Sequence, residues 1–271
     1  MKILSKLLLI FALPLILLGT VSKNDIIHPV EKESGYLTIR FDNSIGRQDL
    51  ILNTADYMNA AGESFSISQL QYFVSNIKLG QVDGTEFAVT QDSSYFLVQE
   101  NKPTTKAINL KIPAGDYNRV SFVLGVDSIR NTMNISKRSG VLDPASSMDN
   151  GMYWGWNSGY IFFKMEGTSQ AAPADPTGQH KFRYHIGGFG GYSAPTINNI
   201  KTISLDLTPV GIVELHKGKK ATIRIRADIL KVFTGSTNLS IAAHPSVMFS
   251  EYSVNVANNY SHMFVHDRTE N

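Results

Sequence analysis

Two tryptophans lie two positions apart in the segment GMYWGWNSGYIFFKMEG, which covers residues 151–167. If this segment is extended, Trp154 and Trp156 lie on one face and can form one wall of a binding site. An intact tryptophan is not a metal ligand, because the indole N–H only donates hydrogen bonds. The structural alternative is that the rings anchor a core, since aromatic side chains carry large apolar area. The nearby Met152 has the same two interpretations, as a thioether ligand or as a core residue that fills a gap.

Histidines supply other candidate ligands, because neutral imidazole is the commonest metal ligand among side chains. In the strand predicted over 181–186, His185 alternates with Phe182, Tyr184 and Ile186. The apolar set should face the core, which leaves His185 on the opposite face and free to reach a site.

The C-terminal region carries further histidines. His244 and His262 are candidate ligands, and His262 falls in a predicted short helix. His266 follows at i+4, which would place it on the same helical face as His262 and allow the pair to chelate a metal. His28 falls in a predicted leader and His216 in a predicted basic turn, so surface roles are expected for both.

The chain has no cysteine, which excludes disulfides, zinc–thiolate centres, iron–sulfur clusters and a cysteine nucleophile. A metal would therefore be held by imidazole, thioether or carboxylate groups, of which the first two suit copper. Acidic residues of predicted loops offer hard oxygens suited to Ca²⁺ instead, namely Asp127, Asp143, Asp149 and Asp175. Their spacing matches no EF-hand loop, and turn formation through hydrogen bonds to nearby backbone is the more economical interpretation.

Motifs of the common enzyme classes are missing from the sequence. It contains no G-x-S-x-G nucleophile elbow, no H-E-x-x-H zinc motif and no P-loop. We therefore predict a binding protein without catalytic activity.

The N-terminus reads as a signal peptide over residues 1–22, with Lys2 and Lys6 before the apolar run Leu7–Leu18. The run is short for a transmembrane span, and without cysteine a lipobox anchor is excluded.

The charge of the mature chain is balanced. Cleavage of residues 1–22 would remove two of the 25 basic residues and none of the 23 acidic ones, which leaves 23 of each. No basic excess therefore indicates a nucleic-acid partner. We expect export to the periplasm or cell surface, no membrane span after cleavage, and a flexible leader over 23–34.

Alternation of apolar and polar residues dominates the rest of the chain. Leu37, Ile39 and Phe41 face one way in GYLTIRFD, as expected of a half-buried strand. The same pattern recurs at Val120, Phe122, Leu124 and Val126, and at Ala221, Ile223, Ile225 and Ala227. The segment FSISQLQYFVSN is ambiguous and could begin as a helical turn before a strand at 75–79. We predict an all-β fold, a single-domain antiparallel β-sandwich with few short helices.

Several segments in a fixed order resemble one known family. They are GVDSIRN (125–131), GVLDP (140–144), GMYWGWNSGYIFFKMEG (151–167) and FRYHIGG (182–188), with FSISQLQYFVSNIKL and YFLV upstream and NNYSHMF (258–264) downstream. This pattern is similar to that of the MbnP-like copper-binding proteins associated with methanobactin. The resemblance extends from about Gly35 to Phe264, and we assign 35–267 to an MbnP-like copper-binding domain.

The resemblance implies an exported protein that binds a copper ion. In some members a tryptophan is oxidised to kynurenine by a partner di-haem, peroxidase-like enzyme. Ring opening creates an aniline nitrogen and a ketone, which removes the objection to tryptophan as a ligand precursor. Trp154 and Trp156 match the W-x-W of the family, and His185 matches the histidine of its F-x-x-H-x-G stretch.

Our leading hypothesis is a copper-binding protein for uptake, storage or delivery, with His185, His244 and His262 as candidate ligands and Trp154, Trp156 and Met152 lining the site. The alternative is a non-metal binding module in a surface complex. In that module, Tyr153, Tyr160 and the two tryptophans would present an aromatic platform to a glycan or peptide. A third hypothesis is a structural subunit whose tryptophan segment belongs to the core.

Overall fold

The computed structural model describes residues 33–54, 56–145, 151–155 and 159–271. Strands are the main regular structure in these ranges, and residues 32–271 form one compact unit. The predicted signal peptide and all but the last two residues of the predicted leader lie outside the described ranges. The strands are β1 (Ser34–Ile45), β2 (Gln48–Asp49), β3 (Tyr57–Met58), β4 (Ser64–Gln81), β5 (Glu86–Ala88), β6 (Tyr95–Gln99), β7 (Ala107–Pro113), β8 (Gly115–Leu124), β9 (Tyr153–Trp154), β10 (Gly159–Thr168), β11 (Lys181–Gly187), β12 (Lys201–Asp206), β13 (Val213–Leu215), β14 (Lys220–Asp228), β15 (Ser246–Val247) and β16 (Phe264–Glu270).

Helices are few and short. Within the described residues they are α1 (Ser128–Thr132), α3 (Leu230–Phe233) and α4 (Ser253–Tyr260), with single 3-10 turns at Gln91–Ser93, Pro103–Lys106, Ile135–Lys137 and Gly140–Leu142. None of the helices within the described ranges is long and apolar enough to span a membrane.

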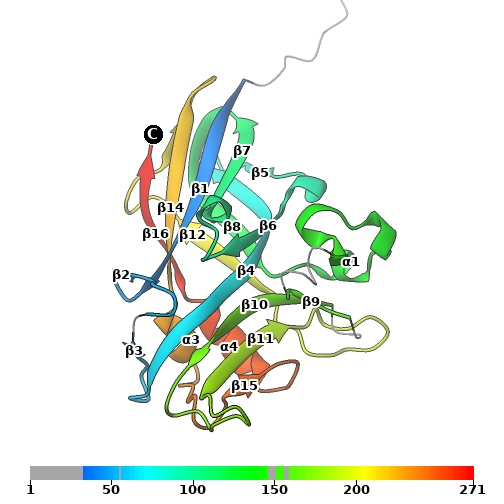
Figure 1. Cartoon of the computed structure of the whole chain (residues 1–271). Coiled ribbons are helices and arrows are strands. Elements are labelled where there is room, and N and C mark those ends of the chain that lie inside the picture. Colours follow the sequence, from blue (N-terminus) through cyan, green and yellow to red (C-terminus); the bar gives the residue numbers. More distant parts are fainter. Residues whose placement is uncertain (1–32, 55, 146–150, 156–158) are drawn as a thin grey trace, which may run out of the picture. The chain divides into compact units, whose positions relative to one another are not determined.

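The strands form two sheets (Figure 1). The smaller sheet has the order β16-β14-β1-β2, with β7 also on β1, and the larger sheet has the order β12-β8-β4-β10-β11-β15 with five further strands at its margins. Most pairs are antiparallel, as predicted, but β1 pairs with β14 in parallel and β11 pairs with β15 in parallel. The β1–β14 pair joins the beginning of the domain to a segment close to its end.

The main core lies between the two sheets. Leu37, Ile39 and Phe41 of β1 and their counterparts on β14 and β8 are buried in one continuous cluster. These are the residues whose alternation predicts half-buried strands, so that expectation is confirmed and the all-β sandwich with it. Burial of such side chains stabilises a fold by roughly 1.5–3 kcal/mol each before the cost of chain entropy.

β4 corrects the prediction of a helical turn near its start. It is one strand of 18 residues from Ser64 to Gln81 and pairs along its length with β3, β10, β6, β8 and β5. Every residue from Leu70 to Ser75 is buried, because both faces of the sheet are covered there, and alternation disappears. Register shifts near Asn76, whose φ of 52° is left-handed, bend the strand between its two sets of partners.

A second core covers the outer face of the larger sheet. Phe73 of β4, Leu97 of β6 and Phe162 of β10 point away from the main core and form a separate buried cluster. The chain between β8 and β10 closes over them with Met152 and Trp154, among others. The described part of the tryptophan segment therefore packs on this face, and α1 lies at the start of the chain that connects β8 to it (Figure 1).

Glu63 links the start of β4 to the loop after α3. Its carboxylate accepts hydrogen bonds from Asn59 Nδ2 and Ser240 Oγ and from the backbone N–H groups of Ile241 and Ala242, at 2.7–3.0 Å. Burial raises the pKa of Glu63, but these hydrogen bonds outweigh it and hold the pKa below its ordinary value of 4.5. The carboxylate form thus stabilises the fold.

We expect this contribution to depend on pH. Since the pKa of Glu63 is lower in the folded than in the unfolded state, the contribution is complete above about pH 4.5 and is lost as pH falls through the folded pKa. Glu63→Gln should lower the free energy of unfolding at pH 7 by about 1–2 kcal/mol, because the neutral amide cannot accept all four bonds. In urea titrations from pH 7 to 3, the mutant should lose less stability than the wild type. Equal losses would contradict this role.

Candidate functional site

The described part of the tryptophan segment lies against the end of β11. β9, which contains Trp154, pairs with Gly159 and Tyr160 of β10. The Trp154 side chain is only 8% exposed, and its ring covers Gly187 so closely that a Cβ there would be 2.7 Å from Cζ3 of the indole. Phe249 meets the indole edge-on at 6.4 Å between ring centroids. Trp156 lies outside the described residues.

His185 occupies the same outer face of the sheet. Tyr184 and Ile186 point into the main core, so His185 lies opposite them, as the sequence predicts. Gly187 is two residues further along β11, which places the imidazole and the indole above it on one side of the strand. The imidazole already has one partner there, because its Nε2 lies 2.7 Å from Oε1 of Glu166.

Lys164 completes a cluster of three polar groups, which we call the His185 triad. His185, Glu166 and Lys164 lie on the adjacent strands β10 and β11, with Lys164 and His185 in register. Lys164 Nζ lies 3.3 Å from Glu166 Oε1 and 3.4 Å from the backbone oxygen of Gly151. The three side chains are 11–27% exposed, so their charges interact under partial desolvation.

Glu166 stays ionised in this environment. The hydrogen bond with His185 and the nearby charge of Lys164 outweigh burial and lower the pKa of Glu166 to about 2. Ionised Glu166 can only accept a hydrogen bond, so in neutral His185 the proton lies on Nε2. The lone pair of the neutral ring then lies on Nδ1.

Sequence reasoning missed Glu166 and Lys164. A signal for them exists, since they are the two charged residues of the apolar run YIFFKMEG and lie two positions apart. In a strand, that spacing puts both on one face. Charged side chains within a buried strand need partners, and a histidine on the next strand is a natural one.

Met152 borders the triad. It follows Gly151, whose backbone oxygen lies near Lys164, and its own carbonyl accepts a hydrogen bond from Ile161 N–H. The Met152 side chain is fully buried in the second core. The core interpretation therefore describes both Met152 and Trp154 in this structure, and both lie beside the polar triad.

The structure gives His244 and His262 separate surroundings. The His244 ring stacks on Tyr252, with 3.5 Å between centroids. His262 is exposed and its Nδ1–H can donate to the backbone oxygen of Asn258. Within the described ranges, no group of three or more histidine or acidic side chains is arranged to hold a metal.

The predicted chelating pair of His262 and His266 does not form. Helix α4 ends at Tyr260, so His262 follows the helix, and His266 lies on β16 where it pairs with β14. A spacing of four residues places two side chains on one helical face only within a helix, and the chain here is not helical. Desolvation lowers the pKa of His266, which keeps it neutral near pH 7.

The acidic loop residues considered as Ca²⁺ ligands form turns instead, as far as the structure describes them. Asp127 accepts from the N–H of Arg130 at the start of α1, Asp143 from the N–H of Ala145, and Asp175 from the N–H groups of Thr177 and Gln179. Asp149 lies outside the described residues. The three described carboxylates thus accept hydrogen bonds from local backbone, and Asp127 also accepts from the side chains of Tyr95 and Gln91.

The described residues of the predicted aromatic platform expose little of their ring surface. Trp154 and Tyr160 are buried, and Tyr153 is partly buried. The hydroxyl of Tyr160 donates to the backbone oxygen of Leu142, which fixes it as part of the second core. A platform built from these rings would require Trp156, whose placement the structure does not describe.

Comparisons with known proteins agree with the landmarks of the sequence. The family model described as MbnP matches residues 34–249. Among solved structures, MbnP from Methylosinus trichosporium is similar, with a TM-score of 0.55 at 17% sequence identity, over 81% of this chain and 82% of that one. At this identity the structural likeness concerns the fold. The search of curated proteins found no match.

Proposed function

Because the chain belongs to the MbnP family, which is associated with methanobactin, we propose that it is an exported protein that binds copper as its cargo, for uptake, storage or delivery. His185 is the ligand on which this proposal depends. The observation that carries it is the contact of 2.7 Å between His185 Nε2 and Glu166 Oε1.

This contact has the form that supports a metal-binding histidine. Histidine ligands usually donate their second ring N–H to a carboxylate or carbonyl, which fixes the ring orientation and raises the basicity of the coordinating nitrogen. Glu166 plays that part here, since its lowered pKa keeps it ionised. Imidazole suits copper in either oxidation state, so Nδ1 of His185 is the proposed donor atom.

Lys164 sets the side on which a cation can bind. Its ammonium lies near Glu166, on the Nε2 side of the imidazole, and would repel a metal placed there. Nδ1 points away from Nε2 across the ring, so copper on Nδ1 avoids this charge. Lys164 also balances Glu166, which keeps the carboxylate from acting as a competing ligand.

Further ligands are proposed from the neighbouring segment. Trp154 and Met152 lie on the same face of the sheet as His185, and Trp156 follows in sequence. A ring-opened tryptophan, produced by a di-haem, peroxidase-like partner, would supply an aniline nitrogen or a ketone, and Met152 a thioether. His244 and His262 stay candidates only if the chain rearranges, given their present separate contacts.

Copper titration of the purified protein tests the proposal. The wild type should bind Cu(I) stoichiometrically, and Glu166→Gln should bind it about 10–100-fold more weakly because the supporting carboxylate is lost. The matched control is Glu86→Gln, since Glu86 also pairs with a lysine, Lys78, at the surface. Equal affinities for the wild type and Glu166→Gln would exclude this arrangement of His185.

One mass measurement tests both export and modification. The intact protein from its native host should lack residues 1–22, and a peptide containing Trp154 and Trp156 should carry the mass change of ring opening. An unchanged peptide would remove the modification and its partner enzyme from the proposal while leaving the His185 ligand in place.

A further inference from the structure

Arg138 is a partly buried cation without a carboxylate partner among the described residues. Its Nε and Nη2 donate to the backbone oxygens of Met133 and Asn131 at 2.7–3.0 Å. These acceptors are neutral and orient the guanidinium without balancing its charge. The neighbouring Arg130 differs, because it forms an ion pair with Asp92.

Aromatic rings next to Arg138 compensate the charge only in part. The guanidinium carbon lies 5.8 Å from the centroid of the Tyr153 ring and 5.5 Å from that of Tyr160. Such contacts contribute about 0.5–2 kcal/mol, and they leave the positive charge in place. A buried charge of this kind favours the approach of an anion.

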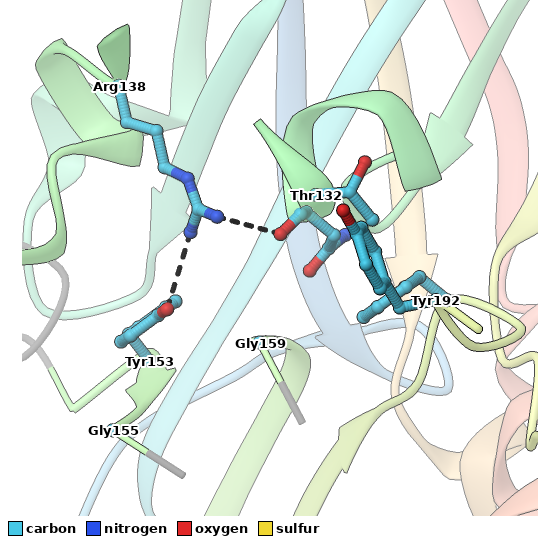
Figure 2. A pocket seen from close by; sticks show the side chains of 8 residues that line it. Thr132, Arg138, Tyr153, Gly155, Gly159 and Tyr192 are labelled. Carbon is cyan, nitrogen blue, oxygen red and sulfur yellow. Dashed lines mark hydrogen bonds between the residues drawn. The ribbon is translucent and has the colours of Figure 1, made fainter. Parts of the chain in front are cut away.

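A cavity of about 250 Å³ opens beside this guanidinium (Figure 2). Figure 2 shows Arg138 directed toward Tyr153 and the end of α1, with Tyr192 across the cavity. The N–H of Nη1 reaches the Tyr153 hydroxyl at 3.4 Å, which is too long for a strong hydrogen bond. This donor can therefore exchange the Tyr153 hydroxyl for an incoming oxygen at little cost.

The walls of the cavity are aromatic. Tyr153, Phe189 and Tyr192 line it, and Gly155 and Gly159 leave room at its floor. Tyr192 is 80% exposed, so its ring is accessible to a ligand in the cavity. Pockets for small molecules typically combine apolar walls with a few polar groups that fix orientation.

We propose that this pocket binds a small ligand that joins a planar ring to a carboxylate, with the carboxylate on Arg138 and the ring between Tyr153 and Tyr192. Nη1 of Arg138 can donate a charge-assisted hydrogen bond to a carboxylate oxygen, and the tyrosines match the faces of a ring. The site is separate from the His185 triad and does not depend on copper.

Calorimetry or ligand-observed NMR with benzoate tests the proposal. Benzoate should bind with a Kd on the order of 1 mM. Benzamide, which has the ring without the charge, and acetate, which has the charge without the ring, should each bind at least about tenfold more weakly. Benzoate that binds no better than benzamide would overturn the role of Arg138.

Two variants locate the binding. Arg138→Gln should abolish benzoate binding, and a thermal melt shows whether it still folds. Tyr192→Ala cannot disturb the core, because its ring is exposed, and should weaken benzoate binding about threefold or more through lost stacking. Tyr36→Ala on β1, another exposed tyrosine, is the matched control. If Tyr192→Ala binds benzoate as tightly as Tyr36→Ala, the pocket assignment is wrong.

Discussion

His185→Ala should lower the affinity of the protein for copper by more than about 100-fold. The substitution removes the coordinating nitrogen itself, whereas loss of a supporting carboxylate costs 10–100-fold in comparable sites. Folding should survive, because Glu166 keeps its contact with Lys164. The measurement is a Cu(I) titration against a competing chelator.

His216→Ala is the matched control for this variant. His216 is exposed in the turn between β13 and β14, so its loss should leave copper affinity unchanged. If His185→Ala and His216→Ala bind copper equally, His185 is not a ligand and the triad has a structural role only.

Gly187→Ala should destabilise the protein by about 1–3 kcal/mol, as expected when a methyl group is forced into a packed region. Its Cβ would lie 2.5 Å from the backbone oxygen of Tyr160 and 2.7 Å from Cζ3 of Trp154. The indole must therefore move away from β11, which should also change the tryptophan fluorescence. Urea unfolding followed by circular dichroism measures the loss.

Gly155→Ala provides the comparison for Gly187→Ala. Among the described residues, no heavy atom lies within 4 Å of a Cβ at Gly155, so this variant should keep the stability of the wild type. Equal stability of the two variants would show that Trp154 does not pack on Gly187 in solution.

Much of the fold could be predicted because its strands alternate. Leu37, Ile39 and Phe41 face the core between the two sheets. The alternation of Phe182, Tyr184 and Ile186 correctly predicts that His185 lies on the opposite face of its strand. The order and direction in which the strands pair cannot be predicted from this alternation. Nothing in the alternation of β1 indicates that it pairs in parallel with β14, far along the chain, since the pattern records only which face is buried.

Errors arose where a second layer covers a strand or a helix ends early. β4 loses its alternation because Phe73 enters the second core while Tyr72 and Val74 enter the main one. The spacing of His262 and His266 predicts a helical pair only if the helix continues, but the chain turns after Tyr260 and becomes β16.

The sequence predicts some residues of the candidate site but not how they are arranged. His185 and Trp154 were identified from their landmarks, but their relation depends on the packing of Trp154 over Gly187. Glu166 was not considered, because its contact with His185 forms across two strands. Residues that meet across strands are set by register, which a single sequence does not reveal.

Nitrogen NMR of the histidine side chains tests the central claim most directly. In the metal-free protein labelled with ¹⁵N-histidine, neutral His185 should carry its proton on Nε2, as the contact with Glu166 requires. Addition of Cu(I) should shift the Nδ1 resonance of His185 and leave the Nε2–H in place. A His185 that carries its proton on Nδ1, or whose Nδ1 resonance does not respond to Cu(I), would contradict the proposed copper site.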